Sequence, residues 1–181
     1  MKSSKLQFKV QSFFPALIII LCAALLRLVP HPANVAPIAA MALFGGAYLN
    51  KKYALVLPLA ALFVSDIFLG FNQSTPFVYG SFILTGLIGM WIKSHKSFAT
   101  VIGGTLLSSV LFFLITNFGF WLAFSLYPKT LGGQMEAYAM ALPFFRNTLI
   151  GDFLYVGIFF GSFEFVLMKL KAKSVKLKTT I

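Results

Sequence analysis

The sequence is poor in the side chains that carry most enzyme chemistry. Its 181 residues include four acidic side chains, two histidines and one cysteine. The two histidines, His31 and His95, cannot form a multi-histidine site, so no metal is predicted. The single cysteine, Cys22, lies in an apolar run and excludes an intramolecular disulfide. Because no glycine-rich nucleotide loop or GxSxG serine motif is present, we expect no cofactor, no direct use of ATP and no enzymatic activity.

Charged residues are scarce as well, at 10% of the chain, whereas hydrophobic residues make up 59%. The mean hydropathy is +0.90. A soluble domain carries about 25% charged residues, so this chain has too little polar surface to coat a water-soluble globule. A membrane span needs about 20 apolar residues. Spans would therefore take up almost the whole chain, and we predict an all-α integral membrane protein with no soluble domain.

Six apolar segments are predicted to cross the membrane as one helical bundle. Their bounds are 13–29, 35–49, 53–71, 76–92, 98–126 and 143–168. This division leaves a basic N-terminus (1–12), one membrane domain (13–168) and a basic tail (169–181). Between the last two spans, residues 134–142 are predicted to form a short interfacial helix.

The second segment, 35–49, is short for a span and rich in alanine and glycine. Small residues spaced four apart, such as Ala36 with Ala40 and Ala42 with Gly46, allow two helices to approach closely. We expect this segment to pack within the bundle. An interface with another protein is the alternative.

Lysine and arginine are distributed unevenly between the two sides. When the six spans are threaded alternately, twelve of the fifteen Lys and Arg residues fall on the side of the termini. The other side holds Arg27, Lys129 and Arg146. Because short cytoplasmic loops retain basic residues, this asymmetry predicts that both termini lie inside the cell. The net charge of +11 is concentrated at span ends and in the tail, where it would face anionic lipid headgroups. Nucleic-acid binding is not expected.

The candidate chemistry lies in the outer half of the bundle. Asp66 is about 7 Å from the outer end of its span, and Asp152 is about 9 Å deep from the same face, at 1.5 Å per residue. Ionisable groups inside spans are costly and usually face a bundle interior or a wet cavity. Of the other two acids, Glu136 lies in the segment 134–142. Glu164, on the inner side, is expected to pair with Lys169 or to extend toward the interface.

Two interpretations of these acids are compatible. In the structural one, Asp66 and Asp152 pair with Arg27 and Arg146 or cap helix breaks, and hold the bundle together. In the functional one, at least one acid lines a polar pocket open to the outside. The candidate binding residues are Arg27, His31, Asn34, Asp66, Asn72, Tyr79, Asn117, Trp121, Arg146, Asn147 and Asp152.

Three stretches of the sequence, 27–48, 58–71 and 146–152, resemble an uncharacterised family of small bacterial membrane proteins. That family is similar to the substrate-binding S components of energy-coupling-factor vitamin transporters. The resemblance implies a six-helix bundle in the bacterial inner membrane that binds a small nutrient in its outer half. It also implies, as partner, a membrane scaffold with ATPases. The Ala-x-x-x-Ala docking pattern common in the first span of S components is absent here.

Two other functions fit the same residues. An integral membrane enzyme acting on a lipid-linked substrate would use Asp66 and Asp152 as paired acid and base. A non-catalytic envelope assembly protein would use segment 35–49 as its interface.

Overall fold

The computed structural model describes residues 2–30, 32 and 34–179, and these residues form helices joined by short turns and linkers. The helices are α1 (Lys2–Leu28), α2 (Ile38–Tyr48), α3 (Lys51–Ala54), α4 (Val56–Leu69), α5 (Thr75–Ser94), α6 (Phe98–Ala123) and α7 (Leu131–Thr179). No strand occurs among the residues described. The prediction of an all-α protein is confirmed.

Four helices are long and apolar enough to cross a membrane. They are Lys51–Leu69 (α3 with α4), Thr75–Ser94, Phe98–Ala123 and Leu131–Ala172. The apolar part of α1, Ser12–Leu28, and the whole of α2 are shorter. The shortness of α2 agrees with the sequence analysis. Each of the six predicted segments therefore contains an apolar helix, and four of these helices have full spanning length.

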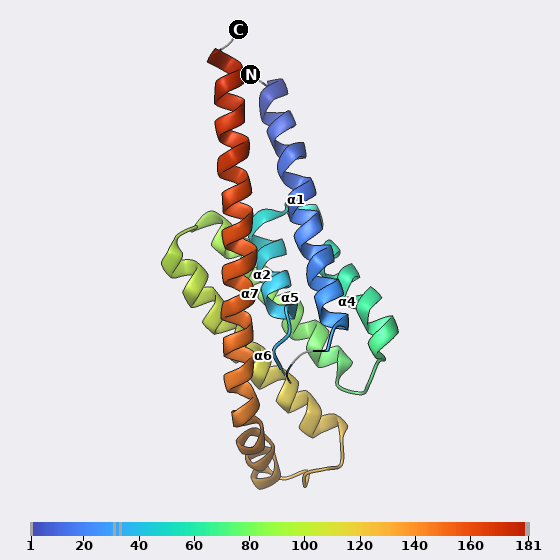
Figure 1. Cartoon of the computed structure of the whole chain (residues 1–181). Helices are drawn as coiled ribbons and strands as arrows, with labels where there is room; N and C mark the ends of the chain where they lie inside the picture. The colour runs from blue at the N-terminus through green and yellow to red at the C-terminus, as the bar shows by residue number, and fades with distance from the viewer. Residues whose placement is uncertain (1, 31, 33, 180–181) are drawn as a thin grey trace.

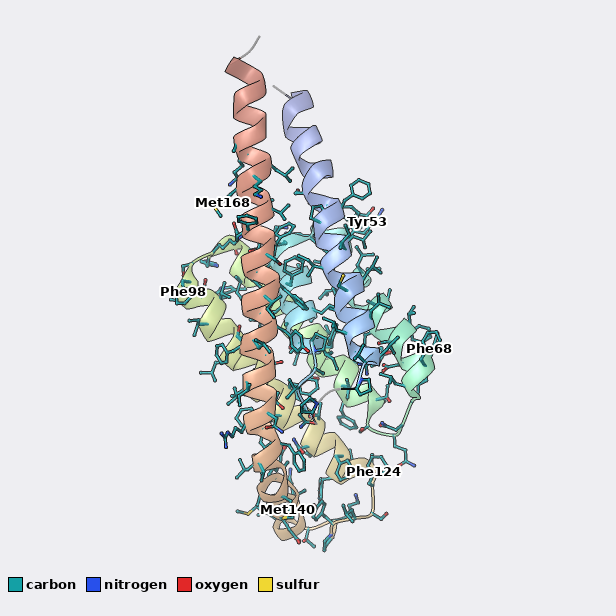
Figure 2. The ribbon with its side chains drawn as sticks, viewed as in Figure 1. Tyr53, Phe68, Phe98, Phe124, Met140 and Met168 are labelled. Carbon is teal, nitrogen blue, oxygen red and sulfur yellow. The ribbon has the colours of Figure 1, made fainter. Side chains whose placement is uncertain are left out.

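Helix α7 differs from the prediction at both ends. Residues 134–142 are not a separate helix, because α7 begins at Leu131 and continues for 49 residues to Thr179. This is far more than the roughly 20 residues needed to cross a bilayer. Pro143 lies inside the helix, and prolines commonly bend helices. The part of α7 that carries Met140 is turned out of line with the rest, at the bottom of Figure 2.

The two ends of the described chain lie at the same end of the molecule. The first turns of α1 and the last turns of α7 extend together beyond the rest of the bundle (Figure 1). Tyr53, Phe98 and Met168 lie toward this end, whereas Phe124 and Met140 lie toward the opposite end (Figure 2). An even number of membrane spans places both termini on the same side, and the observed position of the two ends agrees with this.

Helix α2 lies in the core of the bundle. Its residues from Ala39 to Ala47 are all buried. A helix that is apolar on every side is either a membrane span or buried among other helices, and α2 is too short to span a membrane alone. The neighbours are α1, α3, α4, α5, α6 and α7, and the contact with α5 is the most extensive. The prediction that this segment packs inside the bundle is confirmed.

Glycines bring α2 and α5 into backbone contact. A Cβ atom added to Gly46 would lie 2.2 Å from the Gly86 carbonyl oxygen. A Cβ added to Gly89 would lie 2.2 Å from the Leu43 carbonyl oxygen. Because real Cβ atoms do not approach backbone so closely, only glycine fits at these positions. The contact holds α2 against α5 and thus positions the start of α2.

We predict that Gly89→Ala lowers the stability of the purified protein by about 1–3 kcal/mol, because the added methyl group overpacks the contact between α2 and α5. Gly80→Ala on the same helix is the matched control. A Cβ at Gly80 meets nothing within 4 Å, so this change is expected to leave the stability unchanged or to raise it by up to about 1 kcal/mol through helix propensity. Thermal unfolding in detergent measures both. Equal effects of the two substitutions would contradict the close contact.

Candidate functional site

A buried ion pair joins the ends of α1 and α4. Arg27, in the last turn of α1, places Nη2 2.6 Å from Asp66 Oδ1. Its Nη1 donates to Ser65 Oγ at 2.5 Å and to the Leu62 carbonyl oxygen at 3.4 Å. The side chains of Arg27 and Asp66 are only 13% and 7% exposed. The guanidinium is therefore held by three groups of α4.

Tyr79 of α5 completes this cluster. Its hydroxyl donates to Asp66 Oδ2 at 2.7 Å, so each carboxylate oxygen of Asp66 has a partner. Charges inside a membrane are tolerated when they are paired and hydrogen-bonded. The cluster of Arg27, Ser65, Asp66 and Tyr79 therefore ties three helices together, and the structural interpretation applies to Asp66.

Asp152 has a different environment. It is 4% exposed and lies in the middle of α7, where its Oδ2 is 2.6 Å from Ser109 Oγ of α6. The same hydroxyl lies 3.0 Å from the Thr105 carbonyl oxygen, so its one proton serves one acceptor at a time. Among the residues that the structure describes, no basic side chain forms an ion pair with Asp152.

A cavity of about 290 Å³ lies beside Asp152. It is lined by Arg27, Asn34, Ala36, Ile38, Ala39, Leu69, Phe112, Thr148 and Asp152. The polar groups come from α1, from the linker before α2 and from α7. The apolar wall comes mainly from α2, α4 and α6. The cavity thus combines one ion-paired cation, one carboxylate and neutral hydrogen-bonding groups on an apolar background.

Asn34 lies in the linker between α1 and α2 with a φ of 63°. This left-handed conformation is rare for side chains other than glycine, and asparagine is among those that adopt it most readily. The linker therefore turns sharply at the cavity, and Asn34 is both its turn residue and part of the cavity lining.

Three of the predicted binding residues, Arg27, Asn34 and Asp152, line the cavity. Two others, Asp66 and Tyr79, belong to the ion-pair cluster. His31 lies outside the described residues.

The remaining candidates lie elsewhere. Asn72 accepts hydrogen bonds from the amide and hydroxyl of Ser74 and shapes the turn before α5. Asn117 donates to the Phe113 carbonyl oxygen within α6. Trp121 donates to the Pro128 carbonyl oxygen in the loop after α6.

Arg146 is exposed on α7, and Asn147 is half-buried; neither lines the cavity. The expected pairing of Asp152 with Arg146 is wrong. Residues six apart on a helix are rotated by about 600°, which places them on different faces. Asp152 is bound to Ser109 instead.

Sequence reasoning missed the polar face of α6. Thr105, Ser108 and Ser109 are all buried there, and Ser109 holds Asp152. Ser108 Oγ is buried without a hydrogen-bond partner among the described residues. It precedes the cavity residue Phe112 by four positions and thus shares its helix face. The sequence signal that could have revealed this face is the spacing of Thr105, Ser108 and Ser109, which lie three and four residues apart in an otherwise apolar span.

Glu164 also differs from its predicted pairing with Lys169. It forms an ion pair with Lys96 and accepts a hydrogen bond from Tyr48 at 2.8 Å. The Lys96 ammonium lies 3.9 Å from the centre of the Tyr48 ring. Lys96 stands at the turn between α5 and α6, so this cluster links α2, α6 and α7 at the end of the molecule that holds the chain termini.

The chain belongs to the DUF6580 family, which is described as a family of unknown function. The match covers residues 7–175. Comparison with curated proteins found no match, and neither did comparison with solved structures.

Removing one partner of the Arg27–Asp66 pair leaves a buried charge without compensation. We predict that Arg27→Leu destabilises the protein by roughly 3–5 kcal/mol. The double variant Arg27→Leu with Asp66→Leu should recover much of this loss, because neither charge is then left alone. Exposed Arg146→Leu is the control and should change little. Thermal unfolding in detergent measures all three; an Arg27→Leu variant as stable as the control would show that the ion pair carries no structural role.

Proposed function

We propose that this member of the DUF6580 family is a binding and transport protein for the uptake of a small nutrient. Its six apolar helices would cross the bacterial inner membrane with both termini inside the cell. The bundle would be similar to the S components of energy-coupling-factor transporters. The substrate class implied is a vitamin or a related micronutrient.

The observation that carries this proposal is the cavity beside Asp152. At about 290 Å³ it is near the lower end of the range of ligand pockets, roughly 300–1,000 Å³, and suits a small molecule. Most ligand pockets combine apolar walls with a few placed polar groups. Here Arg27, Asn34, Thr148 and Asp152 are those groups, and they come from segments far apart in the sequence.

The position of the cavity supports uptake from outside. With both termini inside, the end of α1 and the linker before α2 lie at the outer face, and Arg27 and Asn34 belong to these segments. A molecule arriving from outside would reach this cavity before the half of the bundle that holds the termini. Because the chain has no nucleotide motif, the energy for uptake would come from elsewhere, and a membrane scaffold with ATPases is the partner that the resemblance implies.

The geometry favours this proposal over the two alternatives. A two-carboxylate enzyme needs both acids at one substrate, yet Asp66 is occupied by Arg27 and Tyr79 and does not line the cavity that Asp152 lines. An assembly protein that binds its partner through segment 35–49 needs that segment exposed, yet α2 is buried from Ala39 to Ala47.

The first test identifies the ligand. We expect native mass spectrometry of the gently purified protein, followed by extraction, to show a bound small molecule. Asp152→Asn should lower the affinity for that molecule about tenfold or more while membrane insertion is kept, because one hydrogen bond to a charged group contributes roughly 1.5–3 kcal/mol. Exposed Glu136→Gln is the matched control and should bind like the parent. If Asp152→Asn bound the molecule as tightly as the parent, the cavity beside Asp152 would not be the ligand site.

The orientation is testable separately. Reporter tags fused to the N-terminus and to the C-terminus should both report a cytoplasmic location, because the basic residues gather at that end. A periplasmic signal from either tag would contradict the proposed direction of binding.

A further inference from the structure

A second, larger hollow lies farther along α7, nearer the end of the bundle that holds the termini. It is a groove of about 790 Å³ between α6 and α7, next to Tyr48 of α2. Its lining residues are Tyr48, Lys96, Ser97, Phe98, Val101, Ile102, Thr105, Phe153, Val156, Gly157, Phe160, Gly161, Glu164 and Lys171. None of them lines the cavity beside Asp152. The groove is therefore separate from the proposed nutrient site.

The polar residues of the groove gather at one end. Lys96 and Ser97 lie just before α6, and Glu164 and Lys171 lie on the part of α7 nearer the chain termini. The rest of the lining is apolar except for Tyr48 and Thr105. The charged lining residues are two lysines and one glutamate, which leaves one excess positive charge. Glu164 and Tyr48 hold Lys96 in place. The groove thus has an apolar body and a cationic mouth.

The depth of the apolar body matches one leaflet of a bilayer. From Glu164 at the mouth to Phe153 at the deep end, α7 rises about 16 Å, at 1.5 Å per residue. Half of the roughly 30 Å hydrocarbon core is about 15 Å. Gly157 and Gly161 lie along this path, and a Cβ at either would meet nothing within 4 Å. Because glycine has no side chain, these two positions leave open space along α7 and do not serve a close contact with another helix.

We propose that this groove is a binding site for one anionic phospholipid of the inner leaflet. One acyl chain would lie along Gly157 and Gly161, and the phosphate would lie between Lys96 and Lys171. The single excess positive charge complements the single negative charge of a phosphodiester with a neutral headgroup substituent. Anionic lipids are abundant in the cytoplasmic leaflet, toward which the basic end of the molecule would face. A second copy of the chain is the competing occupant.

The test is a lipid titration of the delipidated full-length protein by native mass spectrometry. Phosphatidylglycerol and phosphatidylcholine with identical acyl chains are the two probes. We expect the parent to bind phosphatidylglycerol at least fivefold more tightly. Lys171→Gln should remove about fivefold of that preference, since one lysine near a charged headgroup contributes about that factor. Gly157→Leu with Gly161→Leu should weaken binding of both lipids, because the new side chains fill the groove.

The matched control is Lys52→Gln, which removes a lysine at the same end of the bundle but outside the groove lining. This variant should keep the parent's preference. Three results would overturn the proposal: equal binding of the two lipids by the parent, an equal loss in the Lys52 and Lys171 variants, or a dimer that the glycine substitutions disrupt. Ligand binding beside Asp152 is measured independently, so failure here does not alter the nutrient proposal.

Discussion

The close contact between α2 and α5 is the constraint on which the rest of the bundle depends. Helix α2 has eleven residues, too few to cross a bilayer alone, and it is apolar on every side. Such a helix is stable only in the middle of other helices. Gly46 and Gly89 allow the backbones to touch, which brings α2 to the centre and leaves the outer ring to the longer helices. The start of α2 then forms part of the wall of the cavity beside Asp152.

The two buried acids show two different ways of holding a carboxylate in an apolar bundle. Asp66 is bound by a guanidinium at one oxygen and a phenol at the other, and it does not line the cavity. Asp152 is held by one serine hydroxyl and borders a cavity. Both lie in the same half of the bundle, and their partners rather than their depth distinguish them. The first acid stabilises the scaffold that positions the second.

The molecule is asymmetric between its two ends. The half away from the termini has a small, partly open cavity with a carboxylate and an ion-paired arginine, which suits a small polar molecule. The other has a long apolar groove with lysines at its mouth, which suits a lipid. Helix α7 runs past both, and its residues Asp152 and Phe153 face the two hollows in turn. Adjacent residues of a helix are rotated by about 100°, so one helix serves two sites.

The sequence by itself determined the protein class, the positions of the apolar helices and the half of the bundle that holds Asp66 and Asp152. These features follow from composition, from the length of apolar runs and from the distribution of lysine, all of which can be read without knowing which segments are in contact. It also indicated Arg27, Asn34 and Asp152, because polar residues inside or beside apolar spans are unusual. The short second segment was correctly assigned to the bundle interior from its small residues.

Only the tertiary structure decided which polar groups meet. The sequence had already suggested Arg27 as the partner of Asp66, and the structure shows that pair. That Ser109 rather than Arg146 binds Asp152, and that Lys96 rather than Lys169 binds Glu164, depends on how helices distant in sequence are rotated about their axes. Helix rotation is set by packing contacts such as that of Gly46 with Gly86, which apolar periodicity does not reveal in a chain that is apolar almost throughout. The groove could not be predicted from the sequence for the same reason, because the open space beside Gly157 depends on how α6 and α7 are placed relative to each other. Local chemistry therefore specified the elements, and packing between distant segments specified the sites.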